Sequence, residues 1–344
     1  MVRLHIRDLK PYSSARDEFS GEAEVYLDAN ENSLGSVGSG AFNRYPDPLQ
    51  RAVKERLAAL KGVEPGQIFL GNGSDEAIDL LYRAFCEPKR DHVLLLPPTY
   101  GMYQVCADLN QVKAIPVPLT ADFQLPLGEL VAALRPGTKM IFLCSPNNPT
   151  GNLLDKAQIR RLLEKTQALV VVDEAYGDFA PEGSVLPLLA HFPHLVVLQT
   201  FSKAWGLAGL RLGMAFAHPD VIAVLNRIKP PYNVNLLTQQ HALAALAEVE
   251  AKDQMVADIL AGRAWLEAEL AGVKLVRRVY PSDANFLLVQ VDDAPRRYRE
   301  LVQRGVIVRD RSRVTLCDQC LRITVGTATE NTLLIGHLHA LSGD

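Results

Sequence analysis

Seven short apolar runs alternate with amphipathic segments between residues 67 and 217. Most of these runs are continuously hydrophobic, which is typical of strands buried on both faces of a sheet. The segments between them, such as 75–85 and 156–166, have the spacing of helices with one apolar face. We therefore predict an α/β fold whose large domain contains a mainly parallel, seven-stranded sheet. The apolar runs are residues 67–70, 92–97, 113–118, 139–144, 168–173, 194–199 and 211–217.

The pattern changes in the last third of the chain. Residues 236–270 form a helical stretch rich in Ala, Leu and Glu, without an internal proline. Four apolar segments (VKLVRRV, NFLLVQV, VIVRD and LRITV) and two more helical patterns follow, which predicts a second, smaller α+β domain. We place the large, cofactor-binding domain at residues 41–235 and assign 1–40 and 236–344 to an N-terminal arm and the small domain. The arm is expected to pack on the small domain.

Composition and charge narrow the class of ligand. Of the 344 residues 48% are hydrophobic and 22% charged, the profile of a soluble globular protein, and the net charge is −3. This balance provides no basic surface for nucleic acid or acidic membranes. No apolar run approaches the roughly 18 residues of a membrane span, and the opening MVRLHIRDLK does not resemble a signal peptide. Small-molecule ligands are expected.

The five cysteines do not suggest a disulfide framework, and a reducing cytoplasm fits their number. Cys317 and Cys320 form one CxxC pair, which could be a redox pair or half of a metal site. No second CxxC accompanies it, and the histidines are scattered. A structural role is therefore favoured, and no metal is expected.

Polar residues follow four of the predicted strands, at the edge of an open α/β sheet where ligands bind. The sequence GNGSDE (71–76) follows the first run, and SPNNPTG, with Asn148, follows the fourth. DEAY (173–176) and TFSKAWGLAGLRLG (200–213) follow the next two. We expect these strand ends to converge on one cleft.

The glycine turn 71–76 opens a predicted helix, whose free backbone N–H groups can seat an anion. It matches neither a Walker loop nor a dinucleotide fingerprint, and by itself it could simply cap a helix. Thr200 and Ser202 would add hydroxyl donors, and Arg211 would add a guanidinium suited to phosphate, although it could also be an ordinary ion-pair partner.

Asp173 and Lys203 complete the constellation. Taken alone, the carboxylate could be a helix cap or half of an ion pair, and the lysine could simply reach water at a strand end. Together with an anion seat, they are what pyridoxal phosphate requires: an amine to hold it covalently, an acid beside its ring nitrogen and a hold for its phosphate.

The chain resembles the fold-type-I pyridoxal-phosphate aminotransferases along nearly its whole length, and specifically the class-II histidinol-phosphate aminotransferases. Ten motifs in order carry the resemblance: LDANEN (27–32), RYPDP (44–48), GNGSDE (71–76), PPTYGMY (97–103), CSPNNPTGN (144–152), VVDEAY (171–176), FSKAWGLAGLRLG (201–213), PYNVN (231–235), YPSDANF (280–286) and CLRITVGT (320–327).

The resemblance implies a role for each matching residue. Lys203 would hold pyridoxal 5'-phosphate and move the substrate proton, Asp173 would pair with the ring nitrogen, and Tyr100 would stack on the ring. Tyr176 and Asn148 would hydrogen-bond the ring hydroxyl. The residues implied to hold the phosphate are Gly73, Ser74, Asp75, Thr200, Ser202, Arg211 and, from a second subunit, Tyr45.

The resemblance also implies a homodimer that transfers an amino group from L-histidinol phosphate to 2-oxoglutarate. The products would be imidazole acetol phosphate and L-glutamate, in histidine biosynthesis. Arg322 would clamp the acidic group of either substrate, helped by Arg309 and also by Tyr12 and Asn285. A planar guanidinium can accept phosphate or carboxylate through two hydrogen bonds, which suits two substrates in one pocket.

Two residues depart from the family pattern: Gln199 replaces the usual arginine before the lysine segment, and Trp205 replaces the usual phenylalanine. Other functions stay open. The same chemistry could act on aromatic amino acids, or a related enzyme could decarboxylate threonine phosphate. A non-catalytic ligand sensor with this fold is a further alternative, and the missing glycine fingerprint disfavours a dinucleotide-dependent oxidoreductase.

Overall fold

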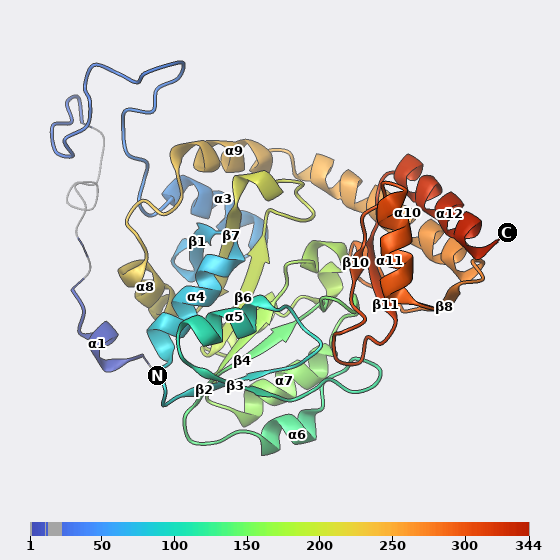
Figure 1. The fold of residues 1–344 in the computed structure, drawn as a ribbon. Helices are drawn as coiled ribbons and strands as arrows, with labels where there is room; N and C mark the ends of the chain where they lie inside the picture. Colours follow the sequence, from blue (N-terminus) through green and yellow to red (C-terminus); the bar gives the residue numbers. More distant parts are fainter. Residues whose placement is uncertain (1, 11, 13–22, 344) are drawn as a thin grey trace.

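The structure, a computed structural model, describes residues 2–10, 12 and 23–343. Two sheets of different size organise it, and Figure 1 shows the larger one at the centre and the smaller one towards the C-terminus. The large sheet has seven strands in the order β1-β7-β6-β5-β4-β2-β3. Its strands are β1 (Ile68–Asn72), β2 (His92–Leu95), β3 (Lys113–Pro116), β4 (Thr138–Cys144), β5 (Leu169–Asp173), β6 (Leu195–Thr200) and β7 (Leu212–Ala217).

The prediction of a mainly parallel seven-stranded sheet is confirmed. β7 is the exception, because it runs antiparallel to both of its neighbours, β6 and β1. Its first residues therefore lie at the edge where the other strands end. This reversal brings Arg211, directly before β7, to the same edge as Thr200.

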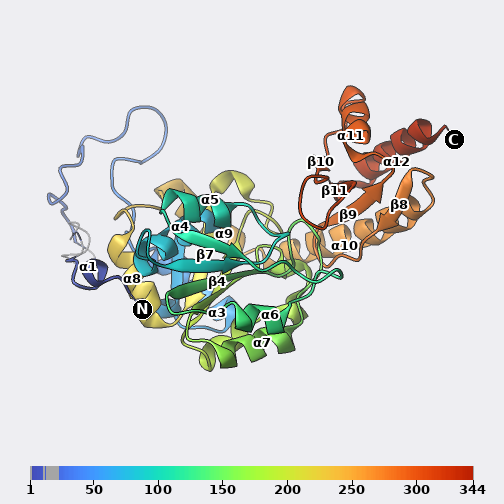
Figure 2. The same cartoon turned by 60° about the horizontal axis from the view of Figure 1, so that its bottom comes forward.

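Helices cover both faces of the large sheet, so that the domain has three layers (Figure 2). Val170 and Val172 of β5 pack in one apolar core and Val171 packs in the other, which explains the continuous apolar runs of the sequence. One face carries α3 (Arg51–Lys61), α6 (Leu127–Ala132) and α7 (Lys156–Lys165). The other carries α4 (Ser74–Phe85), α5 (Met102–Leu109) and α8 (Pro219–Ile228).

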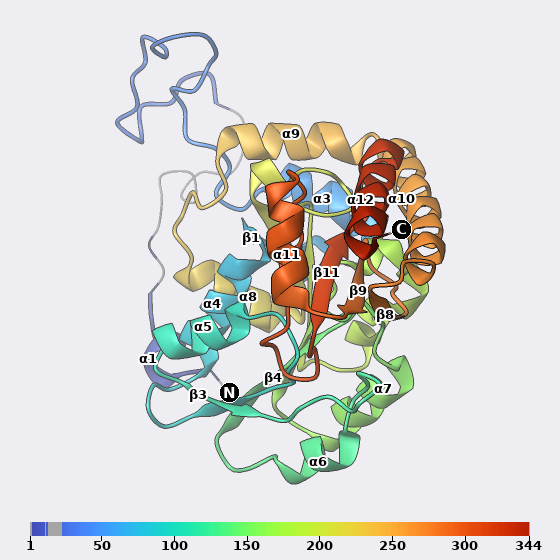
Figure 3. The same cartoon turned by 45° about the vertical axis from the view of Figure 1, so that its right-hand side comes forward.

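The small sheet is antiparallel, in the order β10-β11-β9-β8, and has its own apolar core beneath its helices (Figure 3). The strands are β8 (Val276–Val279), β9 (Phe286–Val291), β10 (Arg309–Asp310) and β11 (Cys320–Thr324). The helices are α10 (Val249–Ala271), α11 (Ala294–Gln303) and α12 (Ala328–Ser342).

The single long helix predicted for residues 236–270 is wrong, because α9 (Leu236–Leu246) and α10 are separate. The chain turns at Ala247 and Glu248. Leu246 belongs to the core of the large domain, whereas Leu266 belongs to the core of the small one. The chain therefore bends between α9 and α10 because the two helices pack on different domains, although the sequence contains no proline there.

The arm also differs from its prediction. The described part of the arm begins with the short helix α1 (Leu4–Arg7) and the residues just before it. Arg3 N donates to Ala84 O at 3.0 Å, and Val2 and Ile6 pack on the apolar core under α4 and α8. This start of the chain therefore lies on the large domain, because apolar side chains find a surface there. The exposed segment 23–43 is also far from the small domain in Figure 1. The boundaries at residues 41 and 236 stay a prediction.

Candidate active site

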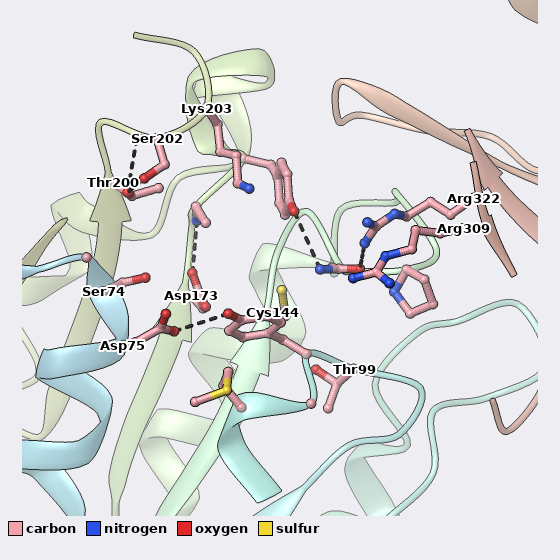
Figure 4. A pocket seen from close by; sticks show the side chains of 18 of the residues that line it. Ser74, Asp75, Thr99, Cys144, Asp173, Thr200, Ser202, Lys203, Arg309 and Arg322 are labelled. Atoms are coloured by element: carbon pink, nitrogen blue, oxygen red, sulfur yellow. Dashed lines mark hydrogen bonds between the residues drawn. The ribbon is translucent and has the colours of Figure 1, made fainter. Parts of the chain in front are cut away.

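A cavity of about 730 Å³ lies at the edge of the large sheet, with the small domain forming part of its wall. Figure 4 shows side chains from both domains pointing into it. It brings together most of the residues singled out in the sequence: Gly73, Ser74, Asp75, Tyr100, Asn148, Asp173, Tyr176, Thr200, Ser202, Lys203, Arg211, Arg309 and Arg322.

The turn from β1 into α4 forms one end of this cavity. Gly73 has φ 73° and ψ 171°, a conformation that only glycine adopts easily, and it caps the amino end of α4. Its N–H donates to Arg211 O at 2.8 Å. A Cβ on Gly213 of β7 would lie 2.1 Å from Ser74 N, so glycine is required for this close approach. The helix N–H groups at Ser74 and Asp75 consequently lie at the sheet edge, where they can bind an anion.

Side chains from the β6–β7 connection complete the anion seat. Arg211 Nη1 donates to Ser202 Oγ at 3.4 Å, and Thr200 Oγ1 donates to the same oxygen at 3.0 Å. No carboxylate of the described residues forms an ion pair with Arg211. A guanidinium, two hydroxyls and a helix N-terminus are the donors that a phosphate group needs.

Lys203 lies in the loop 201–211, which is held at both ends. Thr200 pairs with Gly213 across β6 and β7, and Phe201 N donates to Leu212 O at 3.0 Å. The amine Nζ lies 5.4 Å from the ring centroid of Tyr176. Burial lowers the pKa of Lys203, and the positive charge of Arg322 lowers it further, while Asp173 opposes both. A lower pKa makes the neutral, nucleophilic amine more available near pH 7.

Asp173 ends β5 and is 2% exposed. Its carboxylate accepts hydrogen bonds from Tyr103 Oη at 2.7 Å and from Ala175 N at 3.0 Å. Burial raises the pKa of Asp173 to about 6, against the opposing effect of these two hydrogen bonds. The group is therefore mostly ionised at pH 7, and among the described residues it has no ion-pair partner within 4 Å. A buried carboxylate without a cation suits a ligand with a protonated nitrogen.

The aromatic wall contains Tyr100 and Tyr176. Tyr100 Oη donates to Asp75 Oδ1 at 3.2 Å, and Asn148 Nδ2 donates to Tyr176 Oη at 3.5 Å. Burial raises the pKa of both tyrosines, so their hydroxyls stay protonated at neutral pH. These are hydrogen-bonding groups rather than bases.

Arg309 and Arg322 enter from the small domain, directly opposite each other on β10 and β11. Figure 4 shows the two guanidinium groups together, across the view from Ser74 and Thr200. Arg322 Nη1 donates to Asn148 Oδ1 at 2.5 Å, which connects the small domain to the large one. Burial lowers the pKa of Arg322, although the group remains charged.

Three predicted residues lie outside the cavity of the single chain. Tyr12 is 74% exposed. Asn285 accepts a backbone hydrogen bond from Val325 N at 2.9 Å. Tyr45 stacks on Tyr232 with ring centroids 4.4 Å apart. Tyr45 is predicted to act in the cavity of a second subunit, which a single chain does not test. The roles of Tyr12, Asn285 and Tyr45 therefore stay predictions.

Two residues that the sequence reasoning did not assign also belong to the site. Tyr103 holds Asp173, and Arg311 lines the cavity beside Arg309. Side chains alternate between the two faces of a strand, so residues two apart share a face. Arg311 could therefore have been predicted to lie on the same face as Arg309. Cys317 and Cys320 are buried thiols, and within residues 2–10, 12 and 23–343 no group of three His, Cys, Asp or Glu could hold a metal.

Pyridoxal phosphate fits this donor set. Asp173 and Arg211 are opposite charges in one cavity, and no described residue forms an ion pair with either. A ligand with a protonated ring nitrogen and a phosphate satisfies both groups, and its aldehyde suits the amine of Lys203.

Comparison with known proteins defines the class of enzyme. Residues 21–338 match the sequence profile described as "Aminotransferase class I and II", and the chain belongs to this family. Within it, the chain groups with histidinol-phosphate aminotransferases. The protein of that name from Cytophaga hutchinsonii is 55% identical over 97% of this chain and 96% of its own length. The one from Parabacteroides distasonis is 53% identical over the same shares of the two chains.

A solved structure supports the fold. Histidinol-phosphate aminotransferase from Sinorhizobium meliloti, in complex with pyridoxal-5'-phosphate, superposes with a TM-score of 0.80. It is 24% identical and covers 92% of this chain and 89% of its own.

Proposed function

We propose that this protein is a pyridoxal-phosphate-dependent aminotransferase that converts L-histidinol phosphate and 2-oxoglutarate to imidazole acetol phosphate and L-glutamate, in histidine biosynthesis. One observation carries the proposal: the half-buried Lys203, the buried Asp173 and the anion-binding arginines share one cavity. The names of the relatives at 53–55% identity support the choice of substrate.

The chemistry that pyridoxal phosphate supplies when bound is the withdrawal of electrons from the α-carbon of the substrate. The protein's own groups make this possible. Asp173 would keep a proton on the ring nitrogen, because a positive charge stabilises a buried carboxylate. The Nζ of Lys203 takes the proton from the substrate α-carbon and returns it, which requires a neutral amine. The lowered pKa of Lys203 favours this neutral form.

Arg322 and Arg309 bind the acidic end of each substrate. Two different molecules use the pocket in turn, and the guanidinium groups accept a phosphate or a carboxylate. Tyr100 and Tyr176 line the cavity and would form the wall beside the cofactor ring.

The test of this function is Lys203→Ala. The variant should lose turnover and bind no cofactor covalently, as read from visible absorbance and from the mass of the protein after borohydride reduction. Lys165→Ala, at the exposed end of α7, is the matched control and should behave as wild type. A yellow, active Lys203→Ala protein would contradict the proposal. A panel of histidinol phosphate, aromatic amino acids and threonine phosphate tests the substrate.

We also propose that the protein is a cytoplasmic homodimer. Leu27, Leu34 and Val37 expose apolar side chains on the arm, and the exposed Phe42 and Tyr45 follow them. A second copy would cover this surface, and Tyr45 would reach the cofactor phosphate of its partner. In the described part of the chain, none of the helices has the length and hydrophobicity of a membrane span.

Subunit mixing tests the dimer. Tyr45→Ala and Lys203→Ala are each expected to be impaired, but a mixed dimer contains one site with both side chains intact. Activity should therefore return when the two variants are refolded together. If mixing restores nothing while each variant is dimeric by light scattering, Tyr45 does not act across the interface.

A further inference from the structure

Arg311 extends the row of charges that Arg309 and Arg322 begin. Arg309 lies opposite Arg322, and the ladder continues for one residue, because Arg311 N donates to Cys320 O at 2.9 Å. Residues two apart in an extended segment project to the same face, so Arg309 and Arg311 share the side that faces the cavity. Asp310, between them, accepts a hydrogen bond from Ser312 N at 2.8 Å within its own turn.

The three arginines of the small domain face the cavity without acidic partners. Among the described residues, no carboxylate forms an ion pair with Arg309, Arg311 or Arg322. The pKa of Arg311 is lowered by burial and by the charge of Arg309, against the opposing charge of Asp310. The pKa of Arg322 is lowered by burial and by the charges of Arg311 and Arg309, against the opposing effect of Tyr176. Like charges that face each other across strands destabilise a sheet. Such a cluster is explained by an anion that binds to it.

We propose that Arg311 is a specificity-determining residue that recognises the second negative charge of a phosphate monoester, and so favours the amino phosphate over the carboxylate substrate. The inference rests on the proposed function and deepens it. A phosphate monoester carries about −1.5 to −2 charges at pH 7 and three acceptor oxygens. A carboxylate carries one charge and two oxygens, which Arg322 and Arg309 can satisfy without a third guanidinium.

The test is Arg311→Gln in the holoenzyme, with Arg313→Gln as the matched control. Arg313 is exposed and does not line the cavity, so both variants remove one charge from the same turn. We would measure kcat/KM separately for histidinol phosphate and for glutamate. Arg311→Gln should lower the value for histidinol phosphate about tenfold, as expected for one charge-assisted hydrogen bond, and that for glutamate less than about threefold. Arg313→Gln should change neither.

Binding and stability give two readouts that a structural role would not produce. Inorganic phosphate should inhibit the wild type in competition with histidinol phosphate, and Arg311→Gln should weaken that inhibition about tenfold. The melting temperature of Arg311→Gln should be unchanged or higher, because the repulsion between Arg311 and Arg309 is removed. An equal fall for both substrates, unchanged inhibition by phosphate or a lower melting temperature would each overturn the inference. A wild-type enzyme that does not use histidinol phosphate would instead refute the proposed function.

Discussion

The hydrogen bond from Tyr103 opposes the effect of burial on the pKa of Asp173, so removing its hydroxyl should move the pH at which the cofactor binds. Tyr103→Phe keeps the ring, which stacks on Phe142 with centroids 4.9 Å apart, and deletes the hydrogen bond of 2.7 Å to Asp173 Oδ2. A hydrogen bond to a charged group contributes about 1.5–3 kcal/mol, and one pKa unit corresponds to about 1.4 kcal/mol. The pKa of Asp173 should therefore rise by at least about one unit above its present value of about 6.

Cofactor binding reports this change, because the ionised carboxylate is the form that pairs with a protonated ring nitrogen. At pH 6 the ionised fraction of Asp173 should fall from about one half to about one tenth, whereas at pH 8.5 both proteins are almost fully ionised. We therefore expect Tyr103→Phe to bind pyridoxal phosphate about fivefold more weakly than wild type at pH 6 and equally well at pH 8.5. Titrations of the cofactor-free protein, followed by absorbance between these pH values, measure the difference.

Tyr82→Phe is the matched control. Tyr82 is also buried, and its hydroxyl donates to Tyr103 O at 2.8 Å without reaching Asp173. The titration of the cofactor phosphate is common to all three proteins, so a difference between the curves is attributed to Asp173 and to its effect on the pKa of Lys203. If Tyr103→Phe follows the same pH dependence as Tyr82→Phe, the hydrogen bond does not control this carboxylate and the reasoning fails.

Three further predictions concern other parts of the site. Arg322→Ala should raise KM for both substrates, and an unchanged KM for histidinol phosphate would remove this residue from the anion clamp. Gly213→Ala should destabilise the protein by about 1–3 kcal/mol and weaken cofactor binding, because its Cβ would lie 2.1 Å from Ser74 N. The control is Gly209→Ala, whose Cβ would have nothing within 4 Å and which should be neutral in the same melting and binding assays. Asp173→Asn should become more favourable to folding as pH rises. The pKa of Asp173 in the folded protein is about 6, above the ordinary value of 3.8 for an aspartate, so the ionised carboxylate destabilises the cofactor-free protein above pH 6 and not below pH 4. Denaturant unfolding of variant and wild type should show their stability difference increase by up to about 3 kcal/mol across this range, and a constant difference would contradict the pKa.

The large sheet could be predicted from the sequence because its strands are buried on both faces. β5 places alternate valines in two different cores, and no polar residue interrupts it before Asp173. The end of such a run is easy to locate, and it is also where the polar residues that line the cavity lie. For this reason the sequence alone predicts that Asp173, Lys203 and Arg211 lie together.

The remaining features depend on contacts that no local pattern encodes. The chain turns between α9 and α10 because they pack on different cores, and the arm begins on the large domain because Val2 and Ile6 find an apolar surface there. Tyr103 looks like an ordinary core residue of α5, since it is fully buried. Its role follows from a hydrogen bond to a residue 70 positions away.

The reversal of β7 has a consequence for how the chain can change in length. Connections between parallel strands pass through helices at the surface, where extra residues can be accommodated without moving a strand end. The loop 201–211 instead leaves and re-enters the sheet at neighbouring strands, with Thr200 and Gly213 paired at its base. Only the short 3-10 helix Ala208–Leu210 lies in this loop, so an insertion there would displace the amine relative to the carboxylate on the adjoining strand. We therefore expect this segment to tolerate added residues poorly.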